Sequence, residues 1–105
     1  MTTAAPTVLL VDDETSILDS LRILLKNAGF TPHTAHGGCA GLAALESLSP
    51  DILLSDIRMP GVDGVQLLAA ARARDADLPV ILMTAQATLQ FYRQGSTEVA
   101  ADPQE

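Results

Sequence analysis

The chain has 105 residues, a hydrophobic fraction of 48% and a formal net charge of −7, from 6 basic and 13 acidic residues. This length predicts one domain, and the hydrophobic fraction argues against a disordered chain. The negative charge argues against binding to nucleic acid or to an anionic membrane, which needs clustered Lys and Arg. No apolar run approaches the length of a membrane span, and the N-terminus does not resemble a signal peptide. The single Cys39 fits a reducing cytoplasm.

Strands and helices are predicted to alternate along the chain. The strands are short apolar runs, and the helices place apolar residues at helical spacing. Gly29 ends the first helix, and Pro50 follows the second. This alternation predicts right-handed βαβ units and a parallel sheet. In chain order we expect a strand over residues 7–12, a helix over 17–28, a strand over 31–35, a helix over 39–48, a strand over 52–55, a helix over 65–74 and a strand over 80–84.

The chain after residue 84 lacks such a pattern. Residues 85–93 are consistent with one or two turns of helix, whereas residues 95–105 are polar and acidic. We therefore expect three parts along the chain. These are a disordered N-terminus over residues 1–6, a folded domain over 7–93, and a flexible acidic tail over 94–105.

Three aspartates directly follow two of the predicted strands. Asp12 ends the first strand and Asp13 follows it, and Asp56 follows the third strand. In open α/β sheets, ligands bind beyond the carboxyl ends of strands, where the strand order reverses. If these two strands are neighbours, the three carboxylates converge at that point. Like charges this close disfavour joint ionisation, so a hard divalent cation such as Mg²⁺ is expected among them.

This arrangement suits phosphoryl transfer. An ionised aspartate oxygen can attack phosphorus in line while a metal and hydrogen-bond donors neutralise the transferring oxygens. Thr84 ends the fourth strand on the same rim, where its hydroxyl can donate to a phosphoryl oxygen. The alternative is structural: Asp12 and Asp13 cap the first helix, Asp56 begins a turn, and Thr84 completes a strand. Three carboxylates at matched strand ends favour the metal site.

Three stretches resemble the receiver domain of bacterial two-component response regulators. They are Val8-Leu-Leu-Val-Asp-Asp-Glu14, Asp51-Ile-Leu-Leu-Ser-Asp-Ile-Arg-Met-Pro-Gly-Val-Asp-Gly64 and Leu78-Pro-Val-Ile-Leu-Met-Thr-Ala85. The resemblance implies a flavodoxin-like, doubly wound parallel sheet with strand order 2-1-3-4. It also implies transfer of a phosphoryl group from a sensor histidine kinase, or a phosphotransfer protein, to an aspartate. The amino-acid sequence around Asp56 is most similar to that of receivers attached to transcriptional activators of the nitrogen-regulator type.

The resemblance implies a role for each acidic residue. Asp56 resembles the phosphoacceptor. Asp13 and Asp56 resemble the direct Mg²⁺ ligands, with Asp12 acting through water and the backbone carbonyl of Arg58 completing the protein contribution. The loop over residues 58–64 resembles the segment that moves on activation.

Two residues after the fourth strand also match the family pattern. Thr84 resembles the switch hydroxyl that turns toward the phosphoryl group, and Ala85 resembles the small residue that leaves room for the phosphate. A protein of this kind is a cytoplasmic signalling domain rather than an enzyme with turnover, and it binds no DNA by itself.

The chain departs from the family pattern at its C-terminal end. Family members continue through a fourth helix, a fifth strand ending in Lys-Pro and a fifth helix. The only lysine here is Lys26, within the first helix, so no residue matches the catalytic lysine, and the fifth strand and last helix are missing or degenerate. Phe91 and Tyr92 faintly resemble the start of that strand. Without it, the fourth strand is predicted to be an exposed edge. Such an edge implies marginal stability, or rescue by a homodimer through this edge or by strand exchange.

Two functions follow from these observations. The first is a receiver that accepts a phosphoryl group on Asp56. The second is a degenerate receiver that acts as a phosphorylation-independent protein-interaction module, or a fragment of a transcriptional response regulator. The intact aspartates favour the first function, and the absent lysine favours the second.

Overall fold

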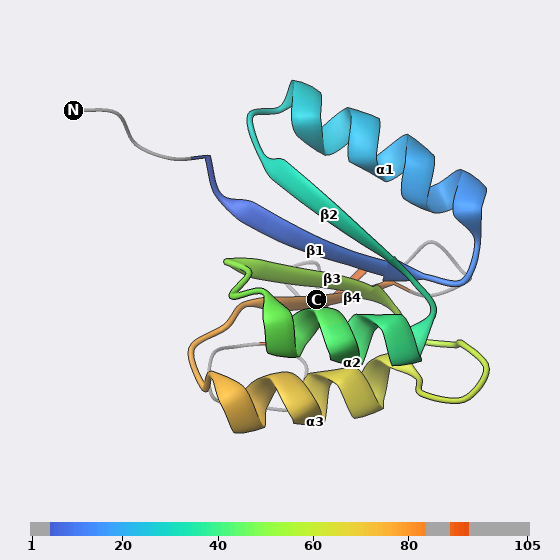
Figure 1. Ribbon diagram of the computed structural model, residues 1–105, viewed down its shortest axis with the longest axis vertical. Coiled ribbons are helices and arrows are strands. Elements are labelled where there is room, and N and C mark those ends of the chain that lie inside the picture. The colour runs from blue at the N-terminus through green and yellow to red at the C-terminus, as the bar shows by residue number, and fades with distance from the viewer. Residues whose placement is uncertain (1–4, 84–88, 93–105) are drawn as a thin grey trace, which may run out of the picture.

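The computed structural model describes residues 5–83 and the strand at residues 89–92. Helices lie on both faces of a central sheet, with α1 on one face and α2 and α3 on the other (Figure 1). The alternation that the sequence predicts is confirmed. The elements are β1 (Thr7–Asp12), α1 (Thr15–Asn27), β2 (Thr31–His36), α2 (Gly38–Ser47), β3 (Ile52–Asp56), α3 (Gly64–Arg74), β4 (Val80–Met83) and β5 (Leu89–Tyr92).

The sheet has the order β2-β1-β3-β4-β5. β1 pairs in parallel with both β2 and β3, and β3 pairs in parallel with β4. This confirms the predicted order 2-1-3-4. The chain leaves β1 in one direction to reach β2 and returns past β1 to reach β3, so the strand order reverses there. The carboxyl ends of β1 and β3 therefore form the topological switch point, where a doubly wound sheet binds its ligand.

The expectation that β4 is an exposed edge is wrong. β5 pairs with β4 in antiparallel orientation, with Val80 opposite Tyr92 and Met83 opposite Leu89. The expected helical turn over residues 85–93 is therefore also wrong where the structure describes this range. A bare edge leaves backbone groups unpaired, and a nearby segment with β-prone aromatic residues satisfies them. The reason for a homodimer through the β4 edge is thereby removed.

β5 is also not the fifth strand of the family pattern, because its antiparallel direction differs from a strand that continues a parallel sheet. Thr84 and Ala85, the two residues assigned to the phosphate side of the site, lie outside the described residues, as does Arg93. Among the residues that the structure does describe, no helix is long and apolar enough to cross a membrane.

Both faces of the central strands are covered. On the face of α2 and α3, alternate strand residues such as Leu9, Leu53 and Leu82 are fully buried. On the opposite face, Val8 and Leu10 are buried beneath Leu18 of α1. Coverage of both faces explains why β1 and β3 are continuous apolar runs rather than alternating ones. The dense packing holds the ends of these two strands in place.

The start of α3 is set by its cap. Asp63 Oδ1 accepts a hydrogen bond from Gln66 N at 2.9 Å, and Gln66 Oε1 accepts one from Asp63 N at 2.9 Å. This reciprocal pair is a capping box, and it begins the helix at Gly64, one residue earlier than apolar spacing predicts. The capping box also fixes the end of the loop that follows Asp56.

We predict that Leu53→Ala destabilises the protein by about 3 kcal/mol, because a fully buried leucine leaves a cavity in a close-packed core. Urea denaturation measures the change. The matched control is Leu24→Ala, since Leu24 is 62% exposed and its truncation should change stability by no more than about 0.5 kcal/mol. Equal losses for the two variants would contradict the core assignment.

Candidate metal centre

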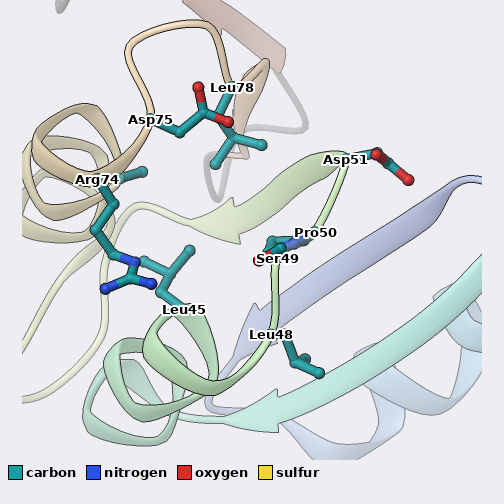
Figure 2. A pocket seen from close by; sticks show the side chains of 9 residues that line it. Leu45, Leu48, Ser49, Pro50, Asp51, Arg74, Asp75 and Leu78 are labelled. Carbon is teal, nitrogen blue, oxygen red and sulfur yellow. The ribbon is translucent and has the colours of Figure 1, made fainter.

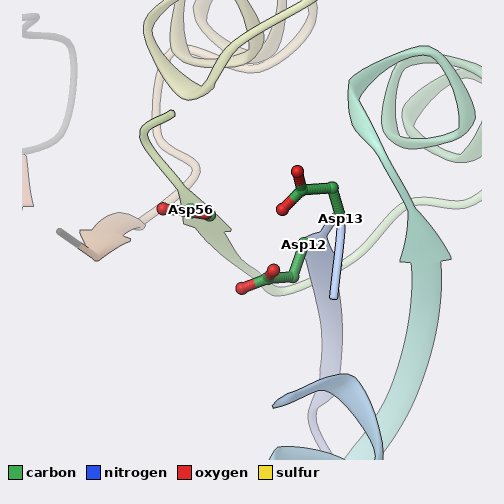
Figure 3. Close-up of side chains that lie close together, drawn as sticks. All are labelled: Asp12, Asp13 and Asp56. Atoms are coloured by element: carbon green, nitrogen blue, oxygen red, sulfur yellow. The ribbon is translucent and has the colours of Figure 1, made fainter. Parts of the chain in front are cut away.

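Three carboxyl groups meet at the switch point. Asp12 ends β1, Asp13 follows it and Asp56 ends β3, and one carboxylate oxygen from each lies within 4.8 Å of the other two. Figure 3 shows the three side chains around the same space beyond the strand ends. The strand register produces this meeting, because Val11 pairs with Ser55 and the next residues are Asp12 and Asp56. An oxygen cluster of this kind matches the ligand preference of Mg²⁺.

Asp12 is the most buried of the three, with 2% of its surface exposed. Burial raises the pKa of Asp12, because it disfavours the charged carboxylate. A hydrogen bond from Glu14 N to Asp12 Oδ1, at 2.9 Å, opposes this effect, and the nearby charges of Asp56, Asp13 and Glu14 add to it. A divalent cation beside Asp12 would offset both the burial and the repulsion.

The helix-cap alternative does not account for these aspartates. The N-cap residue of α1 is Glu14, and no side chain makes a cap hydrogen bond there. Asp12 does accept the Glu14 backbone amide, so it holds the turn that leads from β1 into α1. That bond engages one oxygen of Asp12 and leaves the cluster with Asp13 and Asp56 unexplained by local structure.

The carboxylates open into a cavity of about 440 Å³. This volume holds a metal ion with several waters, since each water occupies about 30 Å³. Arg58 borders the cavity, and its backbone N donates a long hydrogen bond of 3.4 Å to Asp56 Oδ1. Met83 pairs with Asp56 in the β3–β4 register, so β4 ends beside the phosphoacceptor candidate. The lining residues are Asp12, Asp13, Glu14, Ile17, Asp56, Arg58 and Met83.

The sequence patterns assign no functional role to two of the lining residues, Glu14 and Ile17. Glu14 is exposed and adds a fourth negative charge at the rim. Ile17 lies one helical turn further along, on the side of α1 that borders the cavity. The signal available in the sequence was the position of Glu14 directly after the two aspartates.

A second cavity, of about 370 Å³, lies at the opposite end of the sheet (Figure 2). It contains two carboxylates, but both are engaged by backbone amides. Asp51 Oδ2 accepts from Thr7 N at 2.8 Å, and Asp75 Oδ1 accepts from Asp77 N at 2.9 Å. This cavity faces the amino ends of the strands, away from the ligand-binding side of a doubly wound sheet. The switch point is therefore the better candidate site.

Comparison with known proteins identifies the family. The family model named response regulator receiver domain matches residues 8–102 of this sequence. The chain therefore belongs to the receiver domain family of response regulators. The domain boundaries at residues 7 and 93 stay predictions.

Two curated relatives are regulators of transcription. The DNA-binding transcriptional regulator NtrC of Salmonella typhimurium is 46% identical over 100 residues, which are 91% of this chain and 21% of NtrC. The C4-dicarboxylate transport transcriptional regulatory protein DctD of Rhizobium meliloti is 37% identical over 99 residues, which are 94% of this chain and 22% of DctD. This chain therefore spans about a fifth of the length of these relatives.

Solved structures of receivers share the fold. The response regulator TrrA of Thermotoga maritima, in complex with Mg²⁺–BeF, has a TM-score of 0.73 and 34% identity, covering 76% of this chain and 70% of TrrA. The chemotaxis response regulator CheY4 of Vibrio cholerae has a TM-score of 0.74 and 29% identity, covering 80% and 72% of the two chains.

We predict that Asp12→Asn makes the metal-free protein more stable at about pH 7. A raised pKa means that the folded state holds the Asp12 proton more tightly than the unfolded state does. The free energy of unfolding therefore falls as the pH rises from the ordinary Asp pKa of 3.8 through the raised pKa of Asp12. The loss of stability persists at higher pH. Asparagine removes this loss and can still accept the Glu14 amide.

Urea denaturation in the presence of a chelator, at about pH 7 and at about pH 4, measures this effect. The gain of Asp12→Asn should be larger at the higher pH. Asp19→Asn, at an exposed position on α1, is the matched control. A variant less stable than the original protein at about pH 7 would contradict the argument.

Proposed function

We propose that this receiver domain accepts a phosphoryl group on Asp56 in two-component signalling. The observation that carries the proposal is the meeting of three carboxylates at the switch point of a receiver fold. In the proposal, Asp13 and Asp56 bind Mg²⁺ directly, Asp12 acts through water, and the Arg58 backbone carbonyl completes the set. The oxygen-only donor set fits this ion, and TrrA, a structural neighbour, is a complex with Mg²⁺–BeF.

Exposure favours Asp56 over Asp12 as the acceptor. Asp12 is almost fully buried and holds the Glu14 amide, so an incoming phosphoryl donor cannot reach it readily. Asp56 is half-buried and borders the open cavity. Asp56 ends β3, which lies between β1 and β4. A phosphoryl group on Asp56 would therefore lie between the aspartates at the end of β1 and the end of β4.

The transfer requires an ionised and oriented Asp56. The hydrogen bond from Arg58 N engages Oδ1 and leaves the second oxygen available to attack phosphorus. That oxygen forms the new P–O bond as the bond from phosphorus to the donor breaks, which yields an aspartyl phosphate. Bound Mg²⁺ supplies positive charge that stabilises the transferring oxygens.

The phosphoryl donor is a sensor histidine kinase or a phosphotransfer protein, and the domain is a substrate in this exchange rather than an enzyme with turnover. Thr84 is proposed as the switch hydroxyl and Ala85 as the residue that leaves room for the phosphate. The lone exposed Cys39 fits a cytoplasmic location, where thiols stay reduced.

One observation favours a second candidate function. Lys26 is the only lysine of the chain, and it lies exposed near the end of α1 rather than at the site. A receiver without the catalytic lysine lacks one charge-assisted contact to the phosphoryl group. The domain would then act as a phosphorylation-independent module for protein contacts.

We predict that the protein gains one phosphoryl group from acetyl phosphate, that this gain requires Mg²⁺, and that Asp56→Asn abolishes it. The amide has no anionic oxygen with which to attack phosphorus. Intact-mass spectrometry measures the adduct, and Asp51→Asn, at the other end of β3, is the control that should keep it. Labelling of Asp56→Asn at the original stoichiometry would move the acceptor elsewhere. Absence of an adduct in the folded original protein would favour the interaction module.

We predict that Asp13→Ala weakens Mg²⁺ binding by roughly a hundredfold or more. Loss of a direct ligand should exceed the loss of a second-shell partner, which is typically about 10–100-fold. Isothermal titration calorimetry measures the affinity, and Asp19→Ala is the control for loss of one acidic charge from the same part of the chain. An unchanged titration of Asp13→Ala would remove this residue from the metal site.

A further inference from the structure

The first residue of α2 packs directly on the loop that follows Asp56. A Cβ atom built on Gly38 would lie 1.8 Å from the Val62 carbonyl oxygen, 2.6 Å from the Val62 carbonyl carbon and 2.7 Å from Val62 Cβ. Two of these three atoms are backbone atoms, which cannot rotate away as a side chain can. No residue other than glycine therefore fits at position 38 unless the loop moves.

This loop is held firmly at its other contacts. At its start, Ile57 N donates to the Met83 carbonyl oxygen at 2.9 Å. At its end, Gly64 N donates to the Ile57 carbonyl oxygen at 2.9 Å, and the capping box fixes Asp63. Between these ends, Met59 is buried in the core. The contact with Gly38 is thus a further contact that positions this loop, in addition to the hydrogen bonds that fix its ends.

The turn into α2 contacts two parts of the metal centre, which we call its arms. The first arm is the end of β1, and the second is the loop after Asp56. Gly37 N donates to the Asp12 carbonyl oxygen at 2.8 Å. The start of α2 therefore contacts β1 through Gly37 and the Asp56 loop through Gly38. Asp12 and Asp13 belong to the first arm, while Asp56 and Arg58 belong to the second. Displacement of one arm changes the separation of the groups that share the cation.

We propose that Gly38 is a positioning residue for the metal centre: by admitting the Val62 carbonyl group to contact, it sets the place of the loop that carries Arg58. The inference rests on the proposed function of Asp56 and its Mg²⁺ site. A side chain at position 38 displaces Val62, and because hydrogen bonds of Ile57 and Gly64 hold the loop at its ends, the residues between them, Arg58 included, take up the displacement. A change in the place of Arg58 would alter both its backbone carbonyl, the proposed Mg²⁺ ligand, and the 3.4 Å hydrogen bond from its amide to Asp56 Oδ1.

The test is Gly38→Ala, with Mg²⁺ affinity measured by calorimetry and the rate of phosphorylation by acetyl phosphate measured against Mg²⁺ concentration. We expect the Mg²⁺ dissociation constant to rise about tenfold, as for loss of a group that orients a ligand. The concentration of Mg²⁺ that gives half the maximal rate should rise with it. Loss of folded protein alone would lower the amplitude and leave this midpoint in place.

Gly41→Ala is the matched control, because it makes the same change one turn along α2. A Cβ atom there would lie 2.9 Å and 3.0 Å from the two Val11 methyl carbons and 3.3 Å from Leu67 Cδ1, which are side-chain atoms of the core. This variant should lose stability and keep the Mg²⁺ midpoint of the original protein. A Gly38→Ala protein that is folded and has an unchanged midpoint overturns the proposal, and so does an equal shift in both variants.

If Gly38→Ala does not fold, Val62→Ala tests the second step of the proposal, that the place of Val62 affects the metal centre; alanine keeps the Val62 carbonyl group and Cβ atom that face Gly38. Val62 is half-buried and packs against the core, so its truncation loosens the support without a clash. The Mg²⁺ midpoint should again rise, and an unchanged midpoint overturns the proposal. Failure of the original protein to bind Mg²⁺ would reject the proposed function itself, a result distinct from a normal site that ignores both substitutions.

Discussion

The parallel pairing of β1 with β3 is the constraint on which the rest of this structure depends. It places Asp12 and Asp56 at the same level of neighbouring strands, with Asp13 beside them. Three carboxylates in this position repel one another, and the burial of Asp12 adds to that penalty. The fold therefore maintains an arrangement of negative charge that a cation stabilises, on the side of the sheet where doubly wound folds bind ligands.

Rigid packing around the two strands makes this arrangement persist. Helices cover both faces of the sheet, and the loop after Asp56 is held by backbone hydrogen bonds, a capping box and a buried methionine. Glycines allow the backbone segments to approach closely where the loop meets α2 and β3. The candidate metal centre thus has support beyond its three carboxylates, as metal sites generally require.

The pairing of β5 with β4 changes how the end of the sheet is understood. A bare β4 would carry unpaired amides and carbonyls and would favour association with a second copy. Leu89–Tyr92 provides these partners within the chain, although in antiparallel direction. The chain therefore has the four parallel strands that the family resemblance implies. Its sheet ends in an antiparallel strand, where the resemblance implies a strand that continues the parallel sheet.

Local sequence patterns determined the alternation of elements, the apolar strands and the three aspartates at strand ends, because these depend on short-range periodicity and on residue chemistry. The order of the four parallel strands followed from the family resemblance, whereas tertiary structure alone decided how deeply Asp12 is buried, since burial depends on contacts distant in sequence. Tertiary structure also decided the direction of β5 and the contact of Gly38 with Val62. A glycine in the sequence shows only that a side chain is absent, and the space it leaves is identified by the segment that fills it.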